Sequence, residues 1–284
     1  MASMEVGRYA DLKTIRVSTP SPFVKLVEIN RPKKLNAMNR LFWKECRECF
    51  TRLGSDKDVR TIVLSATGRV FTAGIDLKDH MSLFQSDMDE DQDIARMAYS
   101  KRETIENYQE SFTSIERCPK PVICAVHGAC VGAGVDMITA GDIRLCSQNA
   151  FFTVKEVDVG LAADVGTLQR LPKVVRSESL VRELCFTARK MFAAEAKECG
   201  LVSRVFPDKK AMMANALGMA KLIASKSPVA VQGTKMALVH ARDHSVKEGL
   251  DFIKNWNMSM LLSEDIAKSF AGKLAKKTPI FSKL

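Results

Sequence analysis

The sequence predicts an α/β protein in which a parallel sheet is followed by a helical C-terminal region. Three observations support this prediction. Short apolar runs alternate with helix-patterned segments from Phe23 to about Phe206, and such alternation is typical of right-handed βαβ units. From Asp208 onward only helical patterns occur, interrupted at Ser227-Pro228. The chain has 284 residues, 46% of them apolar, which is enough for one large domain and a smaller appendage.

The first elements along the chain are predicted as strand, helix and strand. Apolar side chains alternate over residues 23–30, and Arg31-Pro32 ends the extended run. A helical pattern runs from about Met38 to Leu53, and Gly54 is expected to stop it. Residues 61–65 are centred on the apolar run Ile62-Val63-Leu64, as expected of a parallel strand that is covered on both faces.

A long helix and two loops are expected next. Residues 68–79 are predicted to form a loop that opens a short helix. The acidic stretch 85–93 is predicted to be a surface loop. Apolar residues then recur at helical spacing from Met97 to Ile115, and Pro119 ends this helix.

Two further buried strands complete the predicted sheet. They are expected at 121–126 and 143–146, on either side of a glycine turn and a helix that begins near Gly132. The change to purely helical patterns divides the chain into an α/β domain over residues 1–207 and a helical region over residues 208–284.

Composition excludes several classes of protein. The net charge of +10 comes from scattered Lys and Arg, without a basic stripe interleaved with aromatic residues, so nucleic acid is not an expected partner. A small molecule that carries phosphate groups is compatible with such a diffuse positive field. No run approaches the roughly 18 apolar residues of a membrane span. Eight cysteines in apolar contexts, including the pair Cys46 and Cys49, are expected to be reduced thiols in the core.

Two segments place small residues where a loop turns into a helix. They are FTAGID at 71–76 and GACVGAGVD at 128–136. Small residues let a ligand approach the backbone, and a helix N-terminus presents unpaired N–H groups. Two N–H groups directed at one point would stabilise a developing oxyanion. Each segment alone is explained more simply as a tight turn needed for packing.

Three acidic residues follow, the last of them within an apolar run. Asp136 comes directly after the second glycine turn, Glu156 lies in FTVKEVD, and Asp164 lies in VGLAADVG. An acidic side chain in such a context either caps a helix or takes part in chemistry. For Asp164 both remain open, since a helix could begin at Val165. No metal is expected: the four histidines lack ligand spacing, and His127 is predicted to be structural.

Further short motifs give the pattern a family resemblance. They are NRP at 30–32, LNAMN at 35–39, FTAGIDL at 71–77, HG at 127–128 with GAGVD at 132–136, and DIR at 142–144. Together they resemble the crotonase (enoyl-CoA hydratase/isomerase) superfamily, from about residue 20 to the C-terminus. The run 151–172 is similar to the members that isomerise 3,5-dienoyl-CoA to 2,4-dienoyl-CoA in fatty-acid β-oxidation.

The resemblance implies a crotonase-like ββα-superhelix core, with residues 208–284 as an oligomerisation region. It places the oxyanion hole at the backbone N–H groups of Ile75 and Ala133. Ala133 stands where relatives usually have glycine, which keeps the donor but adds a methyl group near the thioester. The substrate-binding segment beside the hole comprises Ala73, Gly74, Ile75, Asp76 and Leu77.

The resemblance also implies three active-site carboxylates, Asp136, Glu156 and Asp164, with separations of 20 and 8 positions that fit the pattern. The reaction removes a proton from C2 and returns one at C6, which are too far apart for one rigid carboxylate. Glu156 is assigned to C2 and Asp164 to C6, and the reverse order stays open. Asp136 would hold Glu156 in position or tune its proton affinity. No cofactor is expected, because coenzyme A is part of the substrate.

Three carboxylates in one apolar pocket cannot all ionise cheaply, so at least one should be protonated near neutral pH. The main alternative is a 2-enoyl-CoA hydratase, which would need no third acid at Asp164. A non-catalytic RNA- or acyl-CoA-binding protein of the same fold is a further alternative, and it would need neither Glu156 nor Asp164.

The C-terminal residues predict location and assembly. Ser282-Lys283-Leu284 matches the peroxisomal import tripeptide. It predicts an import receptor as a partner and a peroxisome, ordinary or specialised like a glycosome, as the location. The helical region carries more apolar residues than it can bury alone, and the resemblance implies trimers paired into hexamers. These residues are Met236, Leu238, Leu250, Phe252, Ile253, Trp256, Met260 and Leu261.

Overall fold

The computed structural model describes residues 7–86 and 93–284. Its main sheet has six strands in the order β1-β2-β3-β4-β6-β9, all parallel except β1, which pairs antiparallel with β2. The crossovers between parallel strands pass through helices, as the alternating pattern predicted. Strand bounds in this sheet are β1 Ile15–Ser21, β2 Val24–Ile29, β3 Thr61–Ala66, β4 Val122–Val126, β6 Ile143–Ser147 and β9 Arg204–Phe206.

A second, three-stranded sheet lies beside the glycine turns. Its order is β5-β7-β8, with bounds Ala129–Val131, Phe151–Thr153 and Met191–Phe192. These strands are too short to give a sequence pattern, and they were not predicted. Strand β1 was also not predicted, whereas the strands predicted from 23–30, 61–65, 121–126 and 143–146 are confirmed within one or two residues.

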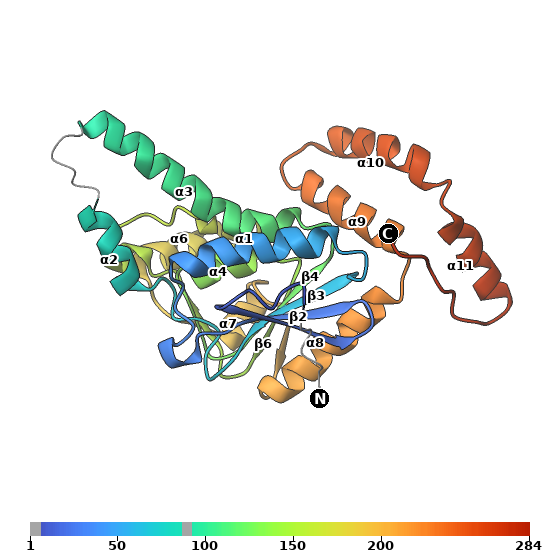
Figure 1. Ribbon diagram of the computed structural model, residues 1–284, viewed down its shortest axis with the longest axis horizontal. Coiled ribbons are helices and arrows are strands. Elements are labelled where there is room, and N and C mark those ends of the chain that lie inside the picture. Colours follow the sequence, from blue (N-terminus) through green and yellow to red (C-terminus); the bar gives the residue numbers. More distant parts are fainter. Residues whose placement is uncertain (1–6, 87–92) are drawn as a thin grey trace.

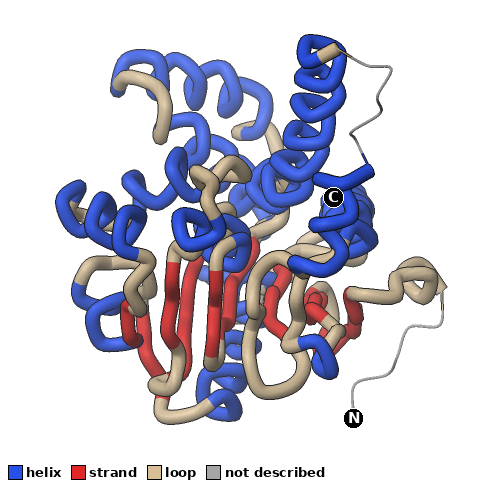
Figure 2. Tube along the Cα trace, turned by 90° about the vertical axis from the view of Figure 1, so that its left-hand side faces the viewer, coloured by secondary structure: helices blue, strands red, loops and turns tan. Residues whose placement is uncertain are grey.

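Helices cover both faces of the main sheet (Figures 1 and 2). On one face α1 and α3 pack together over a large apolar core that includes Phe42, Phe50 and Phe112. Gly54 lies inside α1 and does not end it, because the helix continues to Ser55. The helices of this part are α1 Arg40–Ser55, α2 Leu77–Ser86, α3 Ile94–Arg117, α4 Ala133–Thr139, α5 Thr167–Val174, α6 Glu178–Thr187 and α7 Ala193–Glu198, with short 3-10 turns η1 Pro32–Lys34 and η2 Glu156–Val159.

The opposite face of the sheet is covered by the first helix after Asp208. Small residues of α8 (Lys209–Ala224), such as Ala216 and Ala220, pack on Val63 and Ile123. The chain then leaves the sheet as α9 (Pro228–Ala241), α10 (Val246–Met260) and α11 (Glu264–Leu274), which form an arm at one end of the molecule (Figure 1). Packing thus groups α8 with the sheet, and a domain division at residue 208 stays a prediction.

Three further predictions concern the whole chain. All eight cysteines are buried and unpaired, as expected of reduced core thiols. None of the helices in the described part of the chain is both long and apolar enough to cross a membrane. The surface loop predicted at 85–93 falls mainly on residues 87–92, which lie outside the described residues.

Candidate active site

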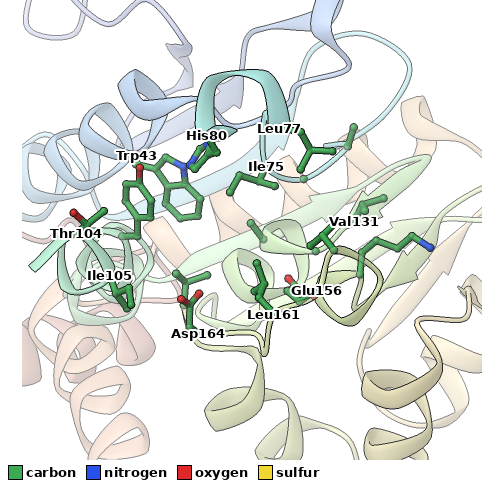
Figure 3. Close-up of a pocket in the computed structure, with 18 of the residues that line it drawn as sticks. Trp43, Ile75, Leu77, His80, Thr104, Ile105, Val131, Glu156, Leu161 and Asp164 are labelled. Atoms are coloured by element: carbon green, nitrogen blue, oxygen red, sulfur yellow. The ribbon is translucent and has the colours of Figure 1, made fainter. Parts of the chain in front are cut away.

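An apolar cavity of about 310 Å³ opens between the two glycine turns, α1 and α3 (Figure 3). Its polar groups are few: two carboxylates, two lysines, a threonine, and the ring atoms of His80, Trp43 and Tyr108. The residues that line it are Trp43, Ala73, Gly74, Ile75, Leu77, His80, Lys101, Thr104, Ile105, Tyr108, Val131, Gly132, Ala133, Lys155, Glu156, Val159, Leu161, Asp164 and Val165. An apolar cleft with a few convergent polar groups is the usual form of a small-molecule site.

Backbone pairing brings the two glycine turns together. Thr72 forms an isolated parallel bridge with Cys130, and Ile75 forms another with Met38. In the second bridge the amide of Met38 donates to Gly74 O, at 2.8 Å. This arrangement leaves the Ile75 amide unused, and across residues 7–86 and 93–284 neither Ile75 N–H nor Ala133 N–H donates to a protein acceptor. Both residues line the cavity, so both are available as oxyanion donors.

Two glycines make this close approach possible. Gly74 has φ +88°, and a Cβ there would lie 2.9 Å from the carbonyl oxygen of Val131. Gly132 has φ +51°, and a Cβ there would lie 3.2 Å from Oε1 of Glu156. Gly132 is also the N-cap of α4, so the carboxylate of Glu156 lies beside the start of this helix and next to Ala133.

Glu156 is the first carboxylate of the cavity and the first residue of η2. Its Oε2 atom is buried, and no partner for it occurs in the described part of the chain. Burial raises the pKa of Glu156, and the charge of Asp164 raises it further. A carboxylate oxygen without a partner in an apolar wall can accept a proton from a bound molecule.

Asp164 is the second carboxylate of the cavity. It keeps an exposed edge, yet partial burial of the carboxyl raises its pKa. The interpretation of Asp164 as a helix N-cap is wrong, because α5 begins at Thr167 with Gly166 as its N-cap. In Figure 3, Glu156 lies toward Val131, whereas Asp164 lies toward Ile105.

Asp136 occupies a different position from the other two acids. It is wholly buried in α4 and does not line the cavity. Its Oδ1 atom accepts a hydrogen bond of 2.5 Å from the Thr167 amide, and its Oδ2 atom has no partner among the described residues. Burial, followed by the charge of Glu156, raises the pKa of Asp136 to about 7. The expectation of three carboxylates within one pocket is therefore corrected to two in the cavity and one beneath it.

The predicted substrate-binding segment lies only partly in the cavity. Ala73, Gly74, Ile75 and Leu77 line the cavity, but Asp76 does not. Instead the carboxylate of Asp76 pairs with Arg31 at 3.0 Å. The Asp76 amide donates to Met38 O at 2.9 Å. Asp76 thus holds the loop rather than contacting the cavity.

An aromatic wall was missed by the sequence analysis. Trp43 of α1 and Tyr108 of α3 stack with centroids 4.7 Å apart, and His80 of α2 packs edge-on against Trp43. Burial lowers the pKa of His80, which favours the neutral ring. These residues occur at ordinary helical spacing, so no signal in the sequence distinguished a cavity wall from core. His127, predicted to be structural, is buried outside the cavity beside Lys209.

This fold and site define an acyl-thioester enzyme of a known class: residues 21–283 match the enoyl-CoA hydratase/isomerase family model, and the chain belongs to that family. It is similar to the mitochondrial Delta(3,5)-Delta(2,4)-dienoyl-CoA isomerase of Homo sapiens, with 56% identity over 276 residues, 96% of this chain and 83% of that protein. It is also similar to the peroxisomal Delta(3,5)-Delta(2,4)-dienoyl-CoA isomerase of Arabidopsis thaliana, with 43% identity over 99% of this chain and 100% of that protein.

A solved structure supports the same class. The enoyl-CoA hydratase from Bacillus anthracis superposes with a TM-score of 0.84 at 25% identity, over 95% of this chain and 99% of that chain. The predicted crotonase-like fold is therefore confirmed.

Proposed function

We propose that this chain is a Δ(3,5)-Δ(2,4)-dienoyl-CoA isomerase. One observation carries the proposal: two carboxylates with raised pKa values line different parts of a single apolar cavity, and one of them lies beside a free helix-terminal amide. The printed activity of the relatives at 56% and 43% identity agrees with this arrangement. A hydratase needs carboxylates only where water is added, near the thioester.

The thioester is proposed to bind with its carbonyl oxygen between the N–H groups of Ile75 and Ala133. Charge collects on this oxygen when a proton leaves C2, because the resulting carbanion is a conjugated dienolate. Donors that are already oriented stabilise this charge without reorganisation, and removal of one such donor typically costs about 10²–10³ in kcat. Gly74 and Gly132 allow the backbone to come this close.

The proton transfers follow from the positions of the carboxylates. Glu156 takes the C2 proton, and the C2–H electron pair forms C2=C3. The C3=C4 pair moves to C4=C5, and the C5=C6 pair takes a proton from Asp164 at C6. Glu156 ends protonated and Asp164 ends ionised, so one proton must return between them, directly or through solvent, before the next turnover.

The order of the two carboxylates is supported by their neighbours. C2 is bonded to the thioester carbonyl carbon, so its base must lie beside the oxyanion hole. Glu156 lies against Gly132, next to Ala133. Asp164 lies toward Ile105 of α3, where the chain beyond C4 would extend (Figure 3). We therefore keep Glu156 for C2 and Asp164 for C6.

Asp136 is proposed to tune Glu156 through charge rather than to hold it. Its one described hydrogen bond goes to the Thr167 amide, not to Glu156. Its raised pKa results from burial and from the charge of Glu156, so the two acids disfavour simultaneous ionisation. With these groups in place the reaction needs neither a metal nor a separate cofactor, since coenzyme A is part of the substrate.

The experiment is an absorbance assay with purified protein and a 3,5-dienoyl-CoA. Growth of the conjugated 2,4-dienoyl-CoA chromophore is the expected result. A parallel sample contains a simple 2-enoyl-CoA, whose hydration would lower its absorbance. Hydration of the 2-enoyl-CoA without any product from the 3,5-diene would replace the proposal by the hydratase alternative.

We further propose that the enzyme assembles as a dimer of trimers through the arm. Helix α10 has no buried residue in the single chain, and Leu250, Leu261 and Phe270 are more than 60% exposed. Burying an exposed leucine contributes about 1.5–3 kcal/mol, so such a surface favours association. Light scattering on the purified protein measures the expected mass of six chains.

We also propose a peroxisomal location, ordinary or specialised, with an import receptor as the partner of Ser282-Lys283-Leu284. The named relatives are mitochondrial or peroxisomal proteins, and the peroxisomal one is 43% identical. Arg60 donates to the carbonyl oxygens of Phe281 and Ser282 at 2.7 and 3.1 Å, so a receptor that encloses this segment would have to release it. Microscopy of the tagged chain with and without residues 282–284 tests the location.

A further inference from the structure

We propose that a polar face of α3, formed by Gln109, Thr113 and Glu116, positions Asp164 for proton transfer at C6. The inference rests on the proposed isomerase activity and adds three positioning residues to it. None of the three lines the cavity, so each would act through Asp164 and its loop.

The three side chains lie on one face of the helix because they are four and three positions apart. Gln109 acts directly: its Nε2 atom donates to the main-chain oxygen of Asp164 at 2.7 Å. Thr113 and Glu116 act through Arg170 of α5. The Nη2 atom of Arg170 donates to Thr113 Oγ1 at 3.2 Å and to Glu116 Oε2 at 3.1 Å.

Arg170 reaches back to the loop that carries Asp164. Gly166 has φ +133°, and a Cβ there would lie 2.1 Å from Nη1 of Arg170. The guanidinium group therefore lies directly on the Gly166 backbone, two residues after Asp164. The segment is thus held at Asp164 by Gln109, and at Gly166 the Arg170 amide donates to the main-chain oxygen at 2.9 Å. The Thr167 amide, bonded to Asp136, fixes its far end.

Arg170, Glu116 and Arg242 form an ion cluster behind the loop, and their opposite charges hold it together. Arg170 is only 9% exposed. Glu116 loses solvation by burial, yet its hydrogen bonds and charge contacts with Arg170 and Arg242 lower its pKa. The guanidinium cannot move away without leaving a partly buried carboxylate short of a partner, and breaking such pairs is costly. Arg242 is the C-cap of α9, so the arm contributes to the same cluster.

The test separates the two proton transfers. Glu156 can exchange the C2 proton with solvent deuterium even when C6 is not protonated, so NMR of the substrate in D₂O measures the first transfer alone. Gln109→Leu removes the donor to Asp164 and leaves Glu156 untouched. We expect isomerisation to fall by about three- to tenfold, as for the loss of one hydrogen bond, while exchange at C2 stays within about twofold.

Three other variants make the test decisive. Asp164→Asn gives the limiting case in which exchange continues without product. Asn107→Leu is the matched control, since Asn107 is an exposed amide on the same helix, and among the described residues its side chain is hydrogen-bonded only to Arg47, at 3.4 Å. Glu116→Gln should give the same signature as Gln109→Leu, because it weakens the hold on Arg170.

Two results would overturn the inference. Equal losses of exchange and isomerisation in Gln109→Leu would mean that the residue only supports the fold. An isomerisation rate equal to that of Asn107→Leu would mean that the bond to Asp164 has no role. A wild-type protein that forms no 2,4-diene would instead count against the proposed function, so the two failures can be told apart.

Discussion

Replacing Asp136 with asparagine should make the free energy of unfolding of the protein less sensitive to rising pH. Asp136 is fully buried, and burial together with the charge of Glu156 raises its pKa from 3.8 to about 7. Asparagine keeps an oxygen that can accept the hydrogen bond from the Thr167 amide, and it has nearly the same size. The substitution therefore removes the titration with little change in shape.

The magnitude follows from linkage between proton binding and folding. The folded state binds the Asp136 proton more tightly than the unfolded state does, so this group's contribution to stability is complete below pH 4 and is lost as pH rises toward 7. A shift of about 3 units corresponds to about 4 kcal/mol, at about 1.4 kcal/mol per unit. Of this amount, roughly 2 to 3 kcal/mol should be lost between pH 5 and pH 8.

The assay is urea unfolding of both proteins at matched concentration, at pH 5, 6.5 and 8. Groups far from Asp136 titrate equally in the two proteins, so the difference between their free energies of unfolding reports Asp136 together with its charge coupling to Glu156. Between pH 5 and pH 8 the free energy of unfolding of the variant should rise by roughly 2 to 3 kcal/mol relative to that of wild type. Parallel curves across this range would show that Asp136 is ionised in the folded protein from pH 5 onward, and would refute the reasoning.

Three other substitutions test separate parts of the site. Gly132→Ala puts a methyl group 3.2 Å from Glu156 Oε1 at φ +51°, so it should cost about 1–3 kcal/mol of stability in thermal unfolding. It should also lower the isomerisation rate by about 10²-fold, since displaced catalytic groups lose about that much. Near-wild-type turnover would show that Glu156 takes no part in the reaction. Ala133→Gly keeps the amide donor, so kcat/KM should stay within about threefold of wild type, whereas loss of an oxyanion donor costs about 10²–10³. A loss of that larger size would show that the Ala133 methyl group itself matters. Asp164→Asn removes a charge that raises the pKa of Glu156, so the acidic limb of C2 exchange should move to lower pH, and an unmoved limb would show that the two carboxylates do not interact.

The sheet was predictable where its strands are buried on both faces. Residues 62–64 and 121–126 are short apolar runs bounded by polar or turn-forming residues, so their pattern alone indicated strands. Strand β1 was not visible, because its sequence IRVSTPS mixes polar residues and a proline at the edge of the sheet. The second sheet has strands of two or three residues, which are too short to form a period.

The acids of the site were predictable as a set but not in their arrangement. An acidic residue within an apolar run stands out, as Asp164 does, whereas the family resemblance grouped Asp136 and Glu156 with it. Which of them reaches a cavity depends on how α4, η2 and the loop before α5 pack together, and that information lies in contacts between distant segments. Trp43, His80 and Tyr108 belong to three different helices and meet only in the folded protein.

The assignment of Glu156 to proton removal at C2 and of Asp164 to protonation at C6 is tested most directly by following both ends of the diene in D₂O. Wild type, Glu156→Gln and Asp164→Asn are each mixed with a 3,5-dienoyl-CoA, and NMR records deuterium at C2 of the substrate and formation of the 2,4-diene. We expect wild type to form product with deuterium at C6, Asp164→Asn to exchange C2 but form almost no product, and Glu156→Gln to do neither. Product formation by Asp164→Asn at the wild-type rate, or C2 exchange that survives Glu156→Gln, would contradict the assignment.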